Sequence, residues 1–218
     1  MPSKADEIIR LYDRHAEAWD RNRSVDLILE RGWMGRFVAL LPSGGSVLDL
    51  GCGSGRPIAR HLLQSGFTVV GVDSSHNLIS KCRNRFPEAE WVVADMRALS
   101  INKKFHGLIA WDSFFYLSHK DQRGMFSIFH EHASSGALLL FTTGPEHGDA
   151  IGSFEGESLY HASLAPGEYR ALLASYGFKV VDHVVEDPKC GGHTVWLAQH
   201  EHSAPINPLQ TQGAALER

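Results

Sequence analysis

The sequence has few cysteines, no long apolar run and almost no excess charge of either sign. Three cysteines in 218 residues are too few and too scattered for a disulfide framework, which favours a reducing, cytoplasmic compartment. No run of about 18 apolar residues exists to cross a membrane, and the N-terminus lacks the apolar stretch of a signal peptide. A formal net charge of −4 provides no basic surface for a phosphate backbone, so nucleic acid is not an expected partner.

Apolar residues make up 43% of the chain, which is enough for a sizeable core and excludes a disordered protein. A length of 218 residues predicts one domain. We expect residues 1–202 to form it, with a helical segment over 1–43 and a core over 44–202. Residues 203–218 have no apolar period and are expected to form a flexible tail.

The first 43 residues have the apolar spacing of helices. One helical stripe contains Ile8, Tyr12, His15 and Trp19. A second helix is predicted to begin after Ser24 as its N-cap and to carry the apolar residues of 25–41 on one face.

From Ser46 onward, short apolar runs alternate with helical patterns. Predicted strands lie at 47–50, 68–72, 91–93, 107–111 and 137–141, and predicted helices at 58–63, 75–85, 120–132 and 167–176. Runs that are apolar on both faces and separated by helices indicate a parallel sheet covered on both sides. Two further strands, 180–185 and 194–197, are joined by a short Pro- and Gly-containing connection, which predicts an antiparallel hairpin at the sheet edge.

A glycine-rich turn follows the first predicted strand, in the sequence VLDLGCGSG at 47–55. Glycines there permit positive φ angles and let a ligand approach the backbone closely. The spacing is G-x-G-x-G, and Arg56 stands where a dinucleotide-binding enzyme needs glycine or alanine. A nicotinamide-dependent oxidoreductase is therefore the least favoured function for this chain.

Acidic residues end the next two predicted strands. Asp73 stands at the end of the second strand, where a carboxylate can accept hydrogen bonds from both hydroxyls of a ribose. Asp95 and Met96 end the third, where an acid can accept from an exocyclic adenine amine while a thioether packs on the ring. The pattern therefore predicts an adenosine site.

With these motifs the chain resembles the class I S-adenosylmethionine-dependent methyltransferases of the small-molecule subgroup. VLDLGCGSG is similar to the first motif of the family, GVD at 71–73 to its second-strand acid, and ADM at 94–96 to its adenine-side acid. The resemblance covers about residues 47–197. It implies an α/β fold with a doubly wound, Rossmann-like, seven-stranded sheet, mostly parallel with an antiparallel C-terminal hairpin strand, and an N-terminal helical lid.

The resemblance also implies which residues hold S-adenosylmethionine. By this resemblance, the methionyl end of the cofactor is lined by Asp49, Gly51 and Gly53, and the sulfonium is flanked by Trp111. A lid arginine often pairs with the cofactor carboxylate, and Arg23 and Arg21 both remain candidates for that role. The implied cofactor-binding residues are Trp19, Arg23, Asp49, Gly51, Gly53, Asp73, Ser74, Asp95, Met96 and Trp111.

The chemistry implied by this cofactor is an in-line displacement at a methyl group that is already activated. The protein mainly aligns the reacting atoms, and a base is needed where the acceptor must lose a proton. Asp112, after the fourth strand, and His161, in the segment where family members often build the acceptor pocket, are the candidate catalytic residues. His193 is an equal alternative to His161. No metal site is predicted, because no second pair completes the one that Cys190 and His193 would begin.

The expected partner is a small-molecule methyl acceptor of aromatic or apolar character. The Asn/Asp-Pro-Pro-Tyr/Phe sequence of base-methylating enzymes is absent after the fourth strand, and no basic domain is appended. The alternative function is a non-catalytic S-adenosylmethionine-binding or partner-binding module. It predicts that Phe114, Phe115 or Tyr160 fills the space beside the methyl group. The sequence predicts no oligomeric state.

Overall fold

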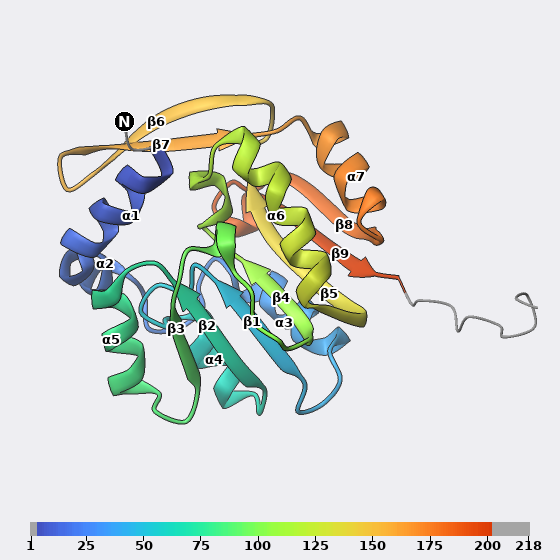
Figure 1. Cartoon of the computed structure of the whole chain (residues 1–218), viewed down its shortest axis with the longest axis horizontal. Helices are drawn as coiled ribbons and strands as arrows, with labels where there is room; N and C mark the ends of the chain where they lie inside the picture. The colour runs from blue at the N-terminus through green and yellow to red at the C-terminus, as the bar shows by residue number, and fades with distance from the viewer. Residues whose placement is uncertain (1–3, 202–218) are drawn as a thin grey trace, which may run out of the picture.

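A seven-stranded sheet organises the computed structural model, which describes residues 4–201 (Figure 1). The strand order is β3-β2-β1-β4-β5-β9-β8. The first five strands are parallel, whereas β9 runs antiparallel to both β5 and β8. Their bounds are β1 Ser46–Leu50, β2 Thr68–Asp73, β3 Glu90–Val93, β4 Phe105–Ala110, β5 Ala133–Thr143, β8 Phe178–Asp187 and β9 His193–His200. The predicted fold class is confirmed.

Helices cover both faces of this sheet, which is why its strands are apolar on both sides. One face packs against α6 and α7, and the other packs against α3, α4 and α5. The helices are α3 Arg31–Leu40, α4 Ile58–Gln64, α5 His76–Arg85, α6 His119–His132 and α7 Pro166–Ser175. Short 3-10 turns are η1 Met96–Ala98, η2 Phe114–Tyr116 and η3 Pro188–Cys190. In the described part of the chain, no helix has the length and apolarity that a membrane span requires.

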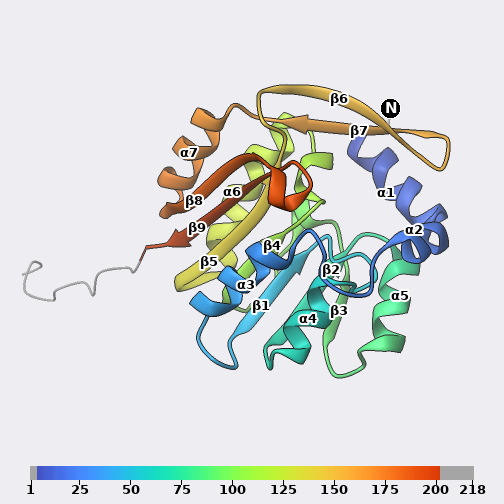
Figure 2. The same cartoon turned by 180° about the vertical axis from the view of Figure 1, so that it is seen from behind.

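The N-terminal segment forms α1 Lys4–Arg14 and α2 Ala16–Asn22, with a break at His15. These helices lie beside the carboxyl end of the parallel strands (Figures 1 and 2). A two-stranded ribbon, β6 Gly148–Phe154 and β7 Glu157–Ser163, runs across the same end. Its contact with α1 is a small apolar cluster of Ile8, Leu11, Leu159, Tyr160 and Ala162.

The ribbon is a feature that the sequence reading missed. Its two-residue turn, Glu155-Gly156, has positive φ at both positions, as tight hairpins require, but it lacks the Asn-Gly or Asp-Gly signature. β6 is exposed along most of its length, so no alternation of apolar and polar residues marked it as a strand.

The second predicted helix begins later than expected. The Ser24 hydroxyl donates to the Asp26 carbonyl and accepts from the Asp26 N–H, so it closes a local turn instead of capping a helix. The Glu30 carboxylate accepts from the N–H of Ile28 and from Arg23, which holds the intervening loop. The helix therefore starts at Arg31, and Ile28 is 66% exposed. The predicted flexible tail, 203–218, lies outside the described residues.

Candidate functional site

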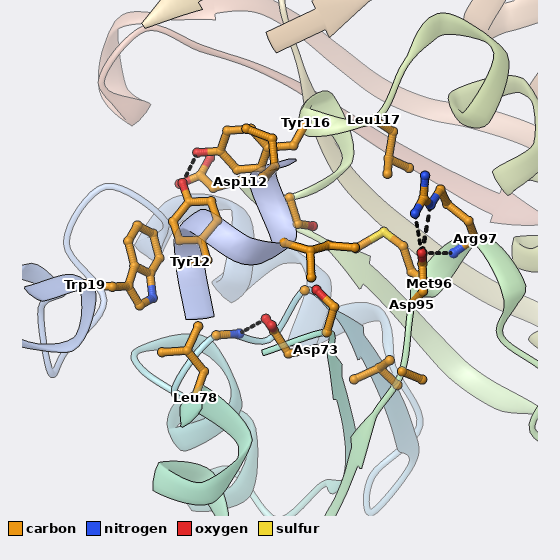
Figure 3. A pocket seen from close by; sticks show the side chains of 18 residues that line it. Tyr12, Trp19, Asp73, Leu78, Asp95, Met96, Arg97, Asp112, Tyr116 and Leu117 are labelled. Carbon is orange, nitrogen blue, oxygen red and sulfur yellow. Dashed lines mark hydrogen bonds and ion pairs between the residues drawn. The ribbon is translucent and has the colours of Figure 1, made fainter. Parts of the chain in front are cut away.

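The ends of four parallel strands converge on one cavity, here called the Asp73 cavity (Figure 3). Gly51 follows β1, Asp73 ends β2, Asp95 follows β3 and Asp112 follows β4, and all four line it. Ligands of open α/β sheets bind at this edge, where the loops that follow the strands meet. The two acids singled out by the sequence thus face a shared cavity.

The glycine turn is shaped by hydrogen bonds to the neighbouring strand. The N–H groups of Gly51 and Cys52 donate to the Val72 carbonyl at 2.8 and 3.1 Å. Gly51 has φ +77°, and a Cβ there would lie 2.3 Å from the Ser113 Cβ. Gly53 has φ +57°, and a Cβ there would lie 3.0 Å from Trp19 Nε1. Side chains are excluded at both positions, so the backbone itself forms the floor of the cavity.

Asp73 links that turn to the start of α5. Its Oδ2 accepts from the Gly53 N–H and its Oδ1 from the Ser75 N–H, both at 2.9 Å. Burial raises the pKa of Asp73 to about 6, and backbone donors, those of Ser75 and Gly53 foremost, oppose that rise. A carboxylate has about four acceptor positions, so these donors leave acceptor capacity for a ligand in the cavity that Asp73 and Ser74 line.

Asp95 is held by an arginine that the sequence reading did not single out. Arg97 Nε lies 2.9 Å from both Asp95 oxygens, and Arg97 Nη2 donates to Asp6 of α1 at 2.8 Å. Burial would raise the pKa of Asp95, but the hydrogen bonds from Arg97 lower it below its ordinary value. Met96 lies beside this pair in the cavity wall (Figure 3). The Arg97 guanidinium therefore joins the lid to the predicted adenine-side acid.

A second cavity, here called the Arg23 cavity, lies on the other side of the glycine turn. Arg23 lines it, donates to the buried Glu30 at 2.9 Å and lies 3.6 Å from Asp112 Oδ2. Arg21 is exposed and lines neither cavity, so the structure brings only Arg23 to the site. Asp49 lines the same cavity, and burial raises the pKa of its carboxyl to about 7.

Two nitrogens in the wall of the Arg23 cavity have unused donors. Trp111 Nε1 and Arg56 Nε are buried and have no hydrogen-bond partner among the described residues. A buried donor without a partner costs free energy, so this end of the site is suited to an anionic group. Sequence reasoning used Arg56 only to exclude a dinucleotide and missed this placement.

The two cavities meet at four residues that line both: Trp19, Gly51, Gly53 and Asp112. Asp112 Oδ1 lies 3.0 Å from His193 Nε2, and the Asp112 N–H donates to Thr142 Oγ1 at 2.9 Å. The hydrogen bond to Asp112 raises the pKa of His193, although burial opposes the rise. Asp112 has φ +49°, a left-handed conformation that a non-glycine residue rarely adopts. A carboxylate is thus held in a strained conformation at the junction.

Aromatic side chains from the lid and from η2 cover the Asp73 cavity. The Tyr12 hydroxyl donates to the Tyr116 hydroxyl at 2.6 Å, and the Tyr12 and Trp19 rings meet edge to face at 5.2 Å (Figure 3). Burial raises the pKa of Tyr12 to about 12, so both partners of this hydrogen bond are neutral near pH 7. The N-terminal helices therefore have the lid position expected from the sequence.

His161 lies apart from these residues. It lines an open groove with Phe115 and His193, and this groove shares no lining residue with the two cavities. Its ring is 5.1 Å from that of Tyr116, one aromatic layer behind the Asp73 cavity. Burial lowers the pKa of His161, which keeps the imidazole neutral near pH 7. The structure does not bring the two candidate catalytic residues, Asp112 and His161, into one cavity.

Known proteins with a similar sequence are methyltransferases. Residues 47–136 match a family model described as a methyltransferase domain. A relative from Streptomyces venezuelae, dTDP-3-amino-3,4,6-trideoxy-alpha-D-glucopyranose N,N-dimethyltransferase, is 26% identical over 132 residues, 58% of this chain and 55% of the relative. Trans-aconitate 2-methyltransferase from Azoarcus is 37% identical over 86 residues, 37% of this chain and 33% of the relative. The chain thus spans about half or less of the length of these curated relatives.

Solved structures resemble the chain over most of its length. Burkholderia thailandensis 1,6-didemethyltoxoflavin-N1-methyltransferase, solved with 1,6-didemethyltoxoflavin and S-adenosylhomocysteine bound, has a TM-score of 0.68. The match covers 90% of this chain and 87% of that one at 18% identity. At this identity the likeness is one of fold.

Proposed function

Because residues 47–136 match a methyltransferase-domain model and residues 4–201 share the fold of solved methyltransferases, we propose that the protein transfers a methyl group from S-adenosylmethionine to a small-molecule acceptor. The observation that carries the proposal is the pair of cavities that meet at the glycine turn. The Asp73 cavity has side chains that suit an adenosine, and the Arg23 cavity has side chains that suit an amino acid.

The residues of the Asp73 cavity suit the nucleoside half. Asp73 has free acceptor positions for the two ribose hydroxyls, and Ser74 follows it in the wall. Asp95 and Met96 offer an acceptor for the adenine amine and a thioether surface for the ring. Gly51 and Gly53 leave the space above the turn open.

The residues of the Arg23 cavity suit the methionyl half. Arg23, together with the unused donors of Arg56 and Trp111, provides partners for a carboxylate. Asp49 provides a partner for the α-ammonium, whose charge favours the ionised form of this buried carboxyl. The junction of the cavities is then the place for the sulfonium.

The bound cofactor supplies an activated methyl group, and the protein's own residues supply alignment. The carbon–sulfur bond breaks as the bond from carbon to the acceptor forms, and the electron pair stays on sulfur. Fixing both partners in line contributes on the order of 7–11 kcal/mol to lowering the barrier. The aromatic lid of Tyr12, Trp19 and Tyr116 excludes water from the reacting atoms.

The alternative of a binding module without turnover receives no support from the site. Phe114 is fully buried in the core, and neither Phe115 nor Tyr160 lines either cavity, so none of the three fills the junction. The names of the relatives, an amino-sugar and a trans-aconitate methyltransferase, support a small-molecule acceptor. The His161 groove is lined by small residues together with Phe115, Glu146, Asp149 and three histidines, so it offers both apolar and polar contacts to an acceptor. We assign Asp112 to the reacting end of the acceptor and His161 to its far end.

Isothermal titration of the purified chain with S-adenosylmethionine and S-adenosylhomocysteine tests the proposal. We expect both to bind with one-to-one stoichiometry and to raise the melting temperature. Absence of heat and of a thermal shift with both ligands would overturn the function.

A further inference from the structure

We propose that the methyl acceptor is an amine and that Asp112 is the residue that receives its nitrogen. The inference rests on the proposed function and specifies its substrate class. It follows from the position of Asp112, from its partners and from the absence of a suitable base at the junction.

The position of Asp112 follows from the two cavities. Only Asp112, Trp19 and the two glycines Gly51 and Gly53 line both, so these residues surround the point where the nucleoside and methionyl halves join. In the proposed binding mode, the sulfur and its methyl group would lie at that point. The two glycines offer only backbone there, so Asp112 is the one ionisable side chain among the residues that line both cavities.

Two basic side chains lie beside the Asp112 carboxyl. Arg23 lies 3.6 Å from one oxygen and His193 Nε2 lies 3.0 Å from the other. The other ring nitrogen of His193, Nδ1, is 2.6 Å from the Cys190 carbonyl, which can only accept. Both ring nitrogens thus face acceptors, an arrangement that suits an imidazolium donating to each. The Asp112 carboxylate is therefore fixed at the junction, where a cationic ligand can pair with it.

The chemistry at the junction favours nitrogen over oxygen. No histidine or lysine lines either cavity within the described residues, and His193 lies outside both, with Nε2 3.0 Å from Asp112 Oδ1 and Nδ1 2.6 Å from the Cys190 carbonyl oxygen. An alcohol needs a base to become nucleophilic, whereas a neutral amine attacks with its own lone pair. A site that has a carboxylate but no imidazole base is suited to the amine.

The surrounding rings point to the same ligand. Tyr12, Trp19 and Tyr116 line the Asp73 cavity with Asp112, and aromatic faces attract cations. Trp19 already has a cation at its ring, the Arg23 guanidinium, 5.5 Å from the centroid. The neutral hydroxyls of Tyr12 and Tyr116 have lone pairs for N–H donors. Acidic and aromatic groups together favour an ammonium group over a neutral or anionic one.

The step balances as follows. The acceptor's ammonium group releases one proton to solvent before it enters the junction, and the neutral amine then donates an N–H to Asp112. Its nitrogen lone pair attacks the methyl carbon, the carbon–nitrogen bond forms, and the carbon–sulfur bond breaks with its electron pair left on sulfur. The methylated ammonium product then loses its proton to solvent.

Sinefungin tests the inference without knowledge of the acceptor. In this analogue a carbon that bears an ammonium group replaces the methylated sulfur, so it places an ammonium nitrogen at the position of the transferred methyl group. S-adenosylhomocysteine lacks any group there. We expect the wild-type protein to bind sinefungin about tenfold more tightly than S-adenosylhomocysteine, the size of one charge-assisted hydrogen bond.

The variant Asp112→Asn removes the charge with little change in shape. We expect it to lose the tenfold preference, measured as the ratio of the two dissociation constants in the same variant, so that a change in overall affinity for the cofactor cancels. Asp149→Asn, in the His161 groove, is the matched control and keeps the preference. Equal binding of the two ligands by the wild-type protein overturns the amine inference even if the variant fails to fold. A preference that survives in folded Asp112→Asn overturns the role of Asp112. Failure of the wild-type protein to bind either ligand overturns the proposed function instead.

Discussion

Replacing Asp73 by alanine removes the acceptor on which the nucleoside assignment depends. In the ligand-free structure its two oxygens accept from the N–H groups of Gly53 and Ser75, and its remaining acceptor positions face the cavity. The substitution therefore takes the ribose partner away and also leaves the glycine turn without its tie to α5. Both effects weaken cofactor binding.

The magnitude follows from the hydrogen bonds lost. Hydrogen bonds to a charged group contribute about 1.5–3 kcal/mol, so Asp73→Ala should raise the dissociation constant of S-adenosylhomocysteine roughly 10- to 150-fold. Asp73→Asn keeps one neutral acceptor oxygen and should have a smaller effect. Isothermal titration at pH 8, where the raised pKa of about 6 leaves Asp73 ionised, measures the difference.

Asp13→Ala is the matched control. The Asp13 carboxylate accepts from the Ser75 hydroxyl at 2.7 Å and from the Asn77 N–H at 3.1 Å, so it supports the same turn but does not line the cavity. We expect this variant to lose stability while binding the ligand within about threefold of wild type. If folded Asp73→Ala binds as tightly as wild type, or if both variants weaken binding equally, the ribose assignment is wrong.

Three other perturbations test separate parts of the site. Gly51→Ala should destabilise the fold by about 3 kcal/mol or more, because the new Cβ would lie 2.3 Å from the Ser113 Cβ and residue 51 has a left-handed backbone conformation. An unchanged melting temperature would refute the close approach of residue 51 to Ser113. Burial raises the pKa of Asp49 to about 7, so its carboxyl group is mostly protonated below that pH. A cationic ligand that needs the ionised carboxylate should therefore bind about tenfold more weakly at pH 6 than at pH 8. Asp49→Asn should flatten that pH profile, and an equally steep profile in the variant would exclude Asp49 as its source. Arg97→Gln should remove the ion pair to Asp6 of α1 and increase the hydrogen exchange of α1 while changing global stability by only about 1 kcal/mol. Unchanged exchange in α1 would show that this ion pair does not hold the helix.

The parallel core and the edge at which Asp73 and Asp95 meet were predictable from local sequence. Strands apolar on both faces alternate with helices, and this pattern alone implies a covered parallel sheet. In such a sheet every parallel strand ends at the same edge, so the spacing of the VLDLGCGSG turn, Asp73 and Asp95 was enough to predict that they share a cavity. These features depend on backbone periodicity, which a sequence displays directly.

The lid and the junction were decided by contacts between distant segments. The β6–β7 ribbon has an exposed strand and an uncommon turn, so it became visible only where it packs on α1. Arg23, and not Arg21, lines the cavity because of the loop that Glu30 holds. Asp112 lies beside His193 because of the way the β8–β9 turn packs beside β4.

The sequence by itself thus determined where the strands end and which acids stand at those ends, because both are properties of a chain read in order. Only the tertiary structure decided which charges meet at the junction. The distances between these charged groups depend on side-chain direction and on how the loops pack, and neither produces a periodic pattern in the sequence.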